Sequence, residues 1–226
     1  MVSIFVNPTQ FGPNEDLSQY PRTFEEDRDK LEGLADLVFA PDVEEMYPPG
    51  AATTISLVGP AAAALEDRFR PTHFQGVATV VAKLLIQALP DLAIFGEKDF
   101  QQLMVVKRMV RDLHLPVRIL GAPTVREGDG LALSSRNRYL SAEERAKAPL
   151  LFRSLQGCAD AIRGGAEPAD AAASAAARLA EAGFAVDYVE CRNADTLEPP
   201  GSGDEPLRVL AAARLGATRL IDNTAV

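Results

Sequence analysis

The chain has 226 residues, of which 47% are hydrophobic and 24% charged, and its 32 acidic and 23 basic residues give a formal charge of −9. These proportions are typical of a folded globular protein and exclude a disordered chain. The acidic excess argues against nucleic acid or an anionic membrane as a partner, but it leaves room for a local basic pocket that binds a small phosphate ligand. At about 150 residues per domain, the length predicts one large domain or two small ones.

The sequence also predicts a cytoplasmic location. It contains no run of about 18 apolar residues, so no membrane-spanning helix is expected. Its first residues lack the basic and apolar regions of a signal peptide. Two cysteines, Cys158 and Cys191, are too few for a disulfide scaffold and are typical of a reducing compartment. We interpret both cysteines and His114 as structural, and we expect no structural zinc site because neither His114 nor His73 lies in a close Cys/His spacing.

Short apolar runs alternate with helical patterns over the first two-thirds of the chain. The expected strands are residues 2–6, 37–40, 53–58, 92–95 and 116–120, and the expected helices are 24–34, 73–89 and 100–113. This alternation predicts a parallel sheet with helices on its faces. In such sheets the ligand binds at the carboxyl ends of the strands, where the loops gather.

The composition changes after Leu140, which predicts a second domain of α+β type. Residues 141–144 form a capping box, from which we expect a helix that runs to Arg163 and ends at a pair of glycines. An Ala-rich helix over 168–183 follows, and then antiparallel strands over 186–190, 207–212 and 218–221, with a flexible loop at 199–206. We place the two domains at residues 1–124 and 125–226.

The first polar segment of interest, residues 5–13, follows the first expected strand. Asn7 and Gln10 are therefore expected at the carboxyl edge of the sheet. A carboxamide both donates and accepts hydrogen bonds, which suits a ligand that carries carboxylate and hydroxyl groups. The alternative is simple turn chemistry, since Asn-Pro often begins a turn.

A second segment, residues 95–102, joins a strand to a helix. Gly96 allows close approach of the backbone to a ligand, and the helix N-terminus offers free amides to an anion. Lys98 supplies a point charge for a phosphate, and Gln102 points back toward the same edge. The alternative is an ordinary turn in which Asp99 caps the helix.

A third segment, residues 131–140, gathers two hydroxyl groups and two guanidinium groups in an acidic chain. Ser134, Ser135, Arg136 and Arg138 are suited to phosphate oxygens, although a charged surface loop has the same composition.

Two weaker candidates complete the set of polar segments. His73, just before a predicted helix, is either a cap or a ligand contact, and no partner for a general base is visible. The run 25–27 either holds Mg²⁺ or forms a solvated first helical turn.

Together these segments resemble the pantoate–β-alanine ligase family, the pantothenate synthetases. The matching strings are residues 3–11, 20–23, 70–77, 95–102, 133–140 and 213–223, and they occur in the family's order along the whole chain. The resemblance implies a Rossmann-like nucleotidyl-transferase fold, a homodimer, and ATP with Mg²⁺. It implies that pantoate and ATP form pantoyl adenylate and pyrophosphate, and that the amine of β-alanine then displaces AMP to give pantothenate.

The resemblance also implies roles for particular residues. Gly96, Glu97, Lys98 and Asp99 would line the ATP site with Lys98 on the phosphates, and Val125 would contact the adenine side. A mobile phosphate loop would be formed by Leu133, Ser134, Ser135 and Arg136. The charge that develops during catalysis would be stabilised by Lys98, Ser134, Ser135 and Arg136. Gln10 and Gln102 would hold pantoate, and Gln10 would also border β-alanine. No metal ligand is implied, and the loop between the domains would act as a lid over the nucleotide.

This chain departs from the family pattern at one point. The family's His-x-Gly-His motif, which stabilises the phosphates, precedes the segment with which this chain begins, so we expect the motif, its strand and its helix to be missing and a sheet edge to be open. A shortened gene model, a fragment and a degenerate paralogue are the possible explanations, and we favour the first because the remaining motifs are intact. The alternative functions are an inactive, truncated nucleotide-binding or dimerisation paralogue and a different adenylate-forming nucleotidyl transferase.

Overall fold

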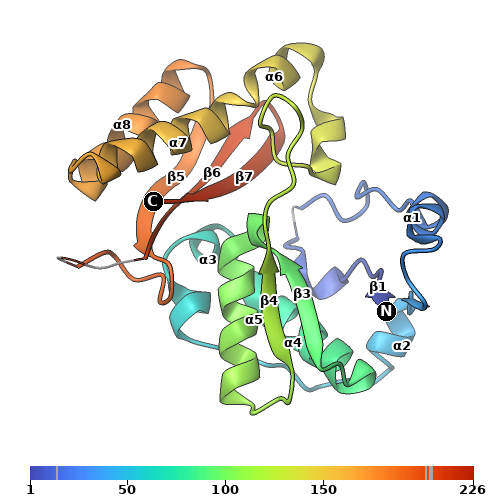
Figure 1. Ribbon diagram of the computed structural model, residues 1–226. Coiled ribbons are helices and arrows are strands. Elements are labelled where there is room, and N and C mark those ends of the chain that lie inside the picture. Colours follow the sequence, from blue (N-terminus) through green and yellow to red (C-terminus); the bar gives the residue numbers. More distant parts are fainter. Residues whose placement is uncertain (14, 202, 204–205) are drawn as a thin grey trace.

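The computed structural model describes residues 1–13, 15–201, 203 and 206–226, and it has a mixed α/β fold (Figure 1). In the first half, β1 (Val2–Ser3) pairs in parallel with β2 (Val38–Phe39), and β3 (Leu92–Gly96) pairs in parallel with β4 (Arg118–Ala122). The second half contains an antiparallel sheet in the order β5 (Ala185–Asn193), β6 (Leu207–Leu215) and β7 (Thr218–Ala225). The predicted mixture of parallel strands and a C-terminal antiparallel sheet is therefore confirmed.

Eight α-helices and four short 3₁₀ helices are found among the described residues. The α-helices are α1 (Phe24–Leu31), α2 (Val43–Met46), α3 (Glu66–Phe69), α4 (His73–Ala88), α5 (Phe100–Asp112), α6 (Ala142–Lys147), α7 (Leu150–Arg163) and α8 (Pro168–Glu181). The 3₁₀ helices are η1 (Pro8–Gln10), η2 (Gly59–Ala62), η3 (Glu97–Asp99) and η4 (Ser135–Tyr139). No α-helix in this part of the chain is long and apolar enough to cross a membrane.

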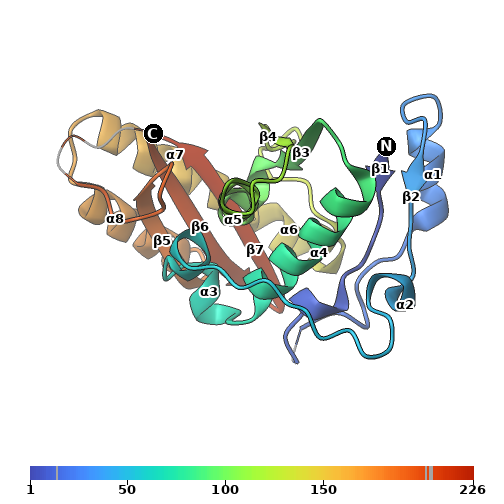
Figure 2. The same cartoon turned by 90° about the horizontal axis from the view of Figure 1, so that it is seen from below.

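The antiparallel sheet is covered on both faces, and this arrangement joins the two halves of the chain (Figures 1 and 2). Side chains of β6 alternate between the two faces, as expected for a strand. Val209, Ala211 and Ala213 pack in the cluster formed with α7 and α8. Leu210 and Ala212 pack instead with residues of α5 and with Leu65. The N-terminal end of α5 therefore lies against the sheet of the second half.

Three details of the predicted secondary structure are wrong. The single parallel sheet is instead two separate two-stranded sheets. Residues 53–58 form no strand, because they run along α4, where the Ile55 N–H donates to Thr79 Oγ1 at 2.9 Å and the Ile55 and Leu57 side chains enter the core. The capping box at Ser141 and Glu144 is confirmed, but the helix that it starts is interrupted at Pro149, which has no N–H to continue it.

The expected flexible loop at 199–206 can be compared with the structure only in part, because residues 202, 204 and 205 lie outside the described residues.

The helix α4 and the turn η1 approach so closely that only glycine fits between them. A Cβ atom added at Gly76 would lie 2.4 Å from the carbonyl oxygen of Thr9 and 2.8 Å from the backbone nitrogen of Gln10. Both neighbours are backbone atoms, so neither has a flexible end that can move aside.

We predict that Gly76→Ala lowers the free energy of unfolding by about 1–3 kcal/mol, because overpacking outweighs the roughly 1 kcal/mol that alanine contributes inside a helix. The control is Gly157→Ala in α7, where the nearest atom to the added Cβ is Arg178 Nη2 at 3.6 Å. Urea unfolding of both variants tests this, and an equal gain of stability in the two would contradict the close approach.

Candidate active site

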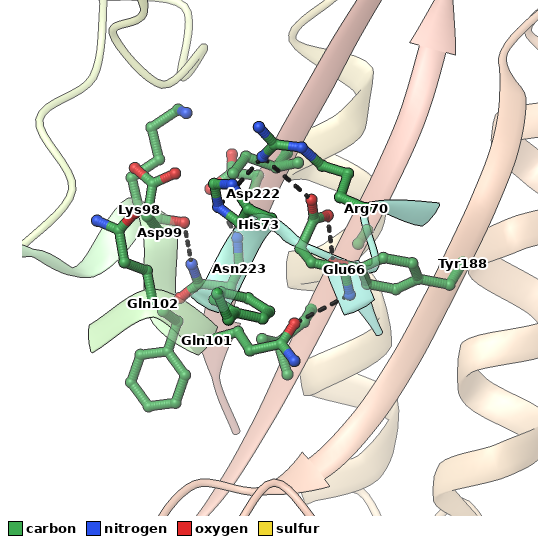
Figure 3. Close-up of a pocket in the computed structure, with 15 residues that line it drawn as sticks. Glu66, Arg70, His73, Lys98, Asp99, Gln101, Gln102, Tyr188, Asp222 and Asn223 are labelled. Atoms are coloured by element: carbon green, nitrogen blue, oxygen red, sulfur yellow. Dashed lines mark hydrogen bonds and ion pairs between the residues drawn. The ribbon is translucent and has the colours of Figure 1, made fainter. Parts of the chain in front are cut away.

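A pocket lies where the end of β3 and the start of α5 meet the antiparallel sheet and the turn before α4. We call it the central pocket (Figure 3). Its lining includes Lys98, Asp99 and Gln102 from the β3–α5 connection, Glu66, Arg70 and His73 from α3 and the start of α4, and Tyr188, Asp222 and Asn223 from the sheet. Residues from both halves of the chain therefore form its walls.

The connection between β3 and α5 is held in place by the last strand of the sheet. The Asn223 side chain donates from Nδ2 to the backbone carbonyls of Glu97 and Lys98, at 2.8 and 2.9 Å. Arg208 donates to Asn223 Oδ1 at 2.6 Å and contacts the Glu97 carboxylate at 3.3 Å. These contacts fix the backbone of the turn that follows Gly96, the last residue of β3.

Lys98, Asp99 and Gln102 share the central pocket. In the described part of the chain, no carboxylate lies within ion-pair distance of the Lys98 amine, so this charge has no protein partner there. Asp99 occupies the position before α5, but its side chain makes no capping hydrogen bond. The turn thus presents a cation and a carboxamide to the same space.

Gln10 does not itself line the central pocket, but its backbone contacts two of the residues that do, Arg70 and His73. Its backbone carbonyl lies 2.9 Å from His73 Nδ1 and accepts from Arg70 Nη2 at 3.2 Å. Its side-chain oxygen accepts from Asn7 Nδ2 at 3.2 Å. His73 is the first residue of α4 rather than its cap, so the capping interpretation of His73 is wrong.

The predicted phosphate loop is arranged around η4. Ser134 caps η4, its Oγ accepting from the Arg136 N–H at 3.3 Å, and Ser135 begins the helix. The Arg136 guanidinium binds both oxygens of Asp16, at 2.8 and 3.0 Å, and lies over the Tyr20 ring. These three residues do not line the central pocket.

Val125 and Leu133 lie next to each other on the segment that joins the two halves. The Leu133 N–H donates to the Val125 carbonyl at 2.9 Å, and both side chains are exposed.

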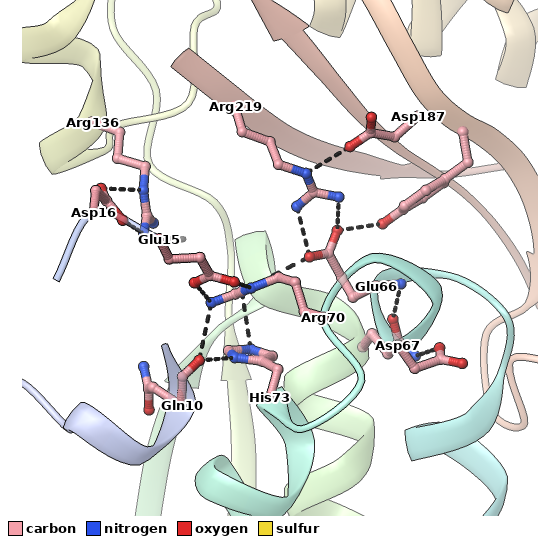
Figure 4. Close-up of polar contacts among 12 residues, drawn as sticks. Gln10, Glu15, Asp16, Glu66, Asp67, Arg70, His73, Arg136, Asp187 and Arg219 are labelled. Atoms are coloured by element: carbon pink, nitrogen blue, oxygen red, sulfur yellow. Dashed lines mark hydrogen bonds and ion pairs between the residues drawn. The ribbon is translucent and has the colours of Figure 1, made fainter. Parts of the chain in front are cut away.

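The sequence interpretation missed a buried charge cluster that links the two halves (Figure 4). Glu66 accepts from Arg219 at 2.7 and 2.9 Å and from the Tyr188 hydroxyl at 3.0 Å, while Arg219 also binds Asp187 at 2.7 Å. We call these four residues the Glu66 cluster. The sequence did contain one signal for this cluster. Arg219 lies on the same face of β7 as Ile221 and Asn223, and an arginine on a covered face needs a buried partner of opposite charge.

The environment shifts the pKa values of Glu66 and His73 below their ordinary ranges. Burial alone would raise the pKa of Glu66, but the hydrogen bonds and charge of Arg219, with Tyr188 and Arg70, outweigh it and hold the pKa below its ordinary value of 4.5. Burial, together with the charge of Arg70, lowers the pKa of His73. Glu66 is therefore ionised and His73 neutral at pH 7.

The acidic side chains of the described residues form no three-ligand metal cluster with His or Cys. Glu25, Glu26 and Asp27 lie in the first turn of α1, where Glu25 and Glu26 are exposed and Asp27 is half-buried. Glu25 pairs with Arg28.

The comparisons with known proteins identify the family. The profile of a family described as Pantoate-beta-alanine ligase matches residues 1–225. The chain is 58% identical to a pantothenate synthetase of Paramagnetospirillum magneticum and 56% identical to one of Rhodopseudomonas palustris. Both alignments cover 100% of this chain. They cover 80% of the length of the first relative and 81% of the length of the second.

Solved structures agree with the sequence relatives. A pantoate–β-alanine ligase of Thermus thermophilus superposes with a TM-score of 0.94 at 51% identity, over 99% of this chain and 82% of that one. A ligase of Francisella tularensis, described as complexed with β-γ ATP and β-alanine, gives a TM-score of 0.79 at 33% identity, over 99% of this chain and 78% of that one. The chain thus has the fold of pantoate–β-alanine ligases of known structure. The chain belongs to the pantoate–β-alanine ligase family, and its function is pantoate–β-alanine ligase activity in pantothenate biosynthesis.

We predict that Glu66→Gln destabilises the chain at pH 7 by roughly 3 kcal/mol, the lower part of the cost of breaking a buried pair, because Asp187 still pairs with Arg219. A carboxyl with a depressed pKa stabilises the fold above its unfolded pKa, and this contribution is lost as the pH falls through the folded value. The difference between wild type and variant should therefore shrink as the pH falls below 4.5.

Urea unfolding over this pH range measures the difference. The control is Glu143→Gln, which removes an exposed pair with Lys147 and should leave stability unchanged within error. A gap that stays constant down to pH ~3 would show that Glu66 does not act through its charge.

Proposed function

We propose that the central pocket is where this ligase activates pantoate with ATP. A pantoate carboxylate oxygen attacks the α-phosphorus of ATP, the bond to the bridging oxygen breaks, and pyrophosphate leaves. The amine of β-alanine then attacks the acyl carbon of pantoyl adenylate and AMP leaves, so that pantothenate forms. The first step converts a poor acyl leaving group into a good one, and the protein contributes positioning and charge stabilisation.

The observation that carries this proposal is the shared position of Lys98 and Gln102. Lys98 offers an ammonium without a protein partner in the described part of the chain, at a turn held by Asn223, and Gln102 faces the same pocket one helical turn later. A cation beside a carboxamide suits a triphosphate beside a hydroxy acid. The ATP and β-alanine named for the Francisella tularensis relative support the same choice of ligands.

The proposed roles of the remaining residues are those that the family resemblance implies. Gly96, Glu97 and Asp99 border the ATP phosphates, and Val125 and Leu133 lie on the nucleotide side. The phosphates are also bound by Ser134, Ser135 and Arg136. For this, Arg136 leaves Asp16 and binds the triphosphate instead, because a carboxylate and a phosphate can each accept two hydrogen bonds from one guanidinium. Gln10 and Gln102 hold pantoate, and Gln10 also borders β-alanine.

Mg²⁺ fits this site as an ion carried on the triphosphate. It keeps several waters and takes only one or two carboxylates, so it requires no three-ligand cluster from the protein. When bound, it neutralises charge on the phosphates. The carboxylate at the pocket available to it is that of Asp99, which makes no cap hydrogen bond.

We further propose that residues 1–124 form a Rossmann-like nucleotidyl-transferase domain and that residues 125–226 form a lid domain of α+β type. Their contact through the Glu66 cluster and Asn223 suits a lid that completes the pocket. We also propose a homodimer, as the family resemblance implies. A reducing, cytoplasmic location is supported by the two buried free thiols of Cys158 and Cys191.

We predict that Lys98→Ala lowers the rate of pyrophosphate release with pantoate and ATP by about 100-fold or more, the usual cost of removing one group that stabilises developing charge. Lys107→Ala, an exposed lysine of the same helix region, should leave the rate unchanged. An unchanged rate for Lys98→Ala with normal ATP binding would remove Lys98 from the site. A wild-type chain that binds ATP without releasing pyrophosphate would favour an inactive paralogue.

A further inference from the structure

We propose that Arg70 and His73 are positioning residues for the ligase reaction: by holding the backbone carbonyl of Gln10, they aim the Gln10 carboxamide at pantoate. This inference rests on the proposed assignment of Gln10 to pantoate. Neither side chain needs to touch the reacting atoms for this role. The argument concerns why Gln10, which lies in a short turn, has a fixed direction.

The contacts of His73 determine the direction of every hydrogen bond at this point. Arginine has donors only, so the 3.3 Å contact between Arg70 Nη1 and His73 Nε2 makes Nε2 an acceptor. The single proton of the neutral ring is then on Nδ1, which donates to the Gln10 carbonyl at 2.9 Å. Arg70 Nη2 donates to the same carbonyl at 3.2 Å. Two donors, one from the residue that caps the end of α3 and one from the residue that begins α4, thus converge on one oxygen.

Arg70 is itself fixed, so it can hold Gln10 in one place. Its guanidinium forms two 2.7 Å hydrogen bonds with the two oxygens of Glu15 and lies 3.9 Å from Glu66. The side chain is only 17% exposed. Through Glu66, Arg70 is connected to Arg219 on β7, so the position of Gln10 depends on the antiparallel sheet (Figure 4).

The side chain of Gln10 remains able to bind a ligand. Asn7 donates to its Oε1 and also to the Gly76 carbonyl at 3.3 Å, which ties the turn to α4. Among the described residues, no group accepts a hydrogen bond from Gln10 Nε2. This free amide donor is suited to a carboxylate or hydroxyl oxygen of pantoate, and its direction follows from the carbonyl that Arg70 and His73 hold.

The first test combines Arg70→Met with Gln10→Ala. Methionine keeps the apolar length of the side chain and removes its donors. Because misplacement of a binding group by about 1 Å can cost 10²-fold, we expect Arg70→Met to raise the pantoate KM by about 10-fold or more, with the ATP KM changed by less than about twofold. In the Gln10→Ala background, the same change should raise the pantoate KM by less than about twofold, since the group being aimed is gone.

The control is Arg108→Met, which breaks a pair with Asp112 outside the central pocket and should change neither KM. Equal effects of Arg70→Met in the two backgrounds would show a general structural role and overturn the inference. If Gln10→Ala leaves the pantoate KM unchanged, the assignment of Gln10 to pantoate is wrong, and both proposals fail at that residue. If Gln10→Ala raises it and Arg70→Met does not, only the positioning inference fails.

A second pair of variants keeps the test decisive if Arg70→Met does not fold. His73→Asn retains an N–H donor close to the position of Nδ1, whereas His73→Leu removes it. We expect His73→Leu to raise the pantoate KM about 10-fold and His73→Asn to return it to within about threefold of wild type. The pantoate KM of each variant is measured at a temperature below the thermal unfolding transitions of both. The inference would be overturned if His73→Asn raised the pantoate KM as much as His73→Leu does while keeping the thermal stability of wild type.

Discussion

The position of one buried carboxylate, that of Glu66, determines how the two halves of this ligase fit together. Removing a carboxylate and a guanidinium from water costs several kcal/mol per ion, and only good geometry with further hydrogen bonds offsets it. Glu66 meets this condition, because Arg219 binds both of its oxygens and the Tyr188 hydroxyl donates to one of them. Any displacement of the antiparallel sheet from α3 would leave these charges buried and unpaired, so the docked arrangement is strongly specified.

The central pocket follows from this docking, since neither half forms it alone. The first half contributes the β3–α5 turn and the start of α4, and the sheet contributes Asn223, which holds the Lys98 backbone. The charges divide between two tasks. Those of Glu66, Arg219, Arg70 and Glu15 satisfy one another, while the Lys98 ammonium has no carboxylate partner in the described part of the chain. Charges that hold the frame are thus separate from the charge that we assign to the triphosphate.

Local patterns in the sequence were sufficient for the elements with a clear period or cap. The helical spacing of apolar residues predicted α4 and α5, and the capping box at Ser141 predicted the start of α6. The same reasoning failed at residues 53–58, because an extended segment packed on a helix has the alternation of a strand. It also missed the pairing of Glu66 with Arg219, which are 153 residues apart, since no local pattern encodes a contact at that distance. The family resemblance pointed to Gln10, Lys98 and Gln102, but not to the residues that hold them.

The most direct measurement is a double-mutant cycle between Glu66 and Arg219, with Glu66→Gln, Arg219→Met and the double variant unfolded by urea at pH 7. If the buried pair holds the two halves together, the double variant should be more stable than the sum of the single effects implies, with a coupling free energy of about 1.5 kcal/mol or more. Single effects that add to within about 0.5 kcal/mol would show that the two side chains do not depend on each other and would contradict this account.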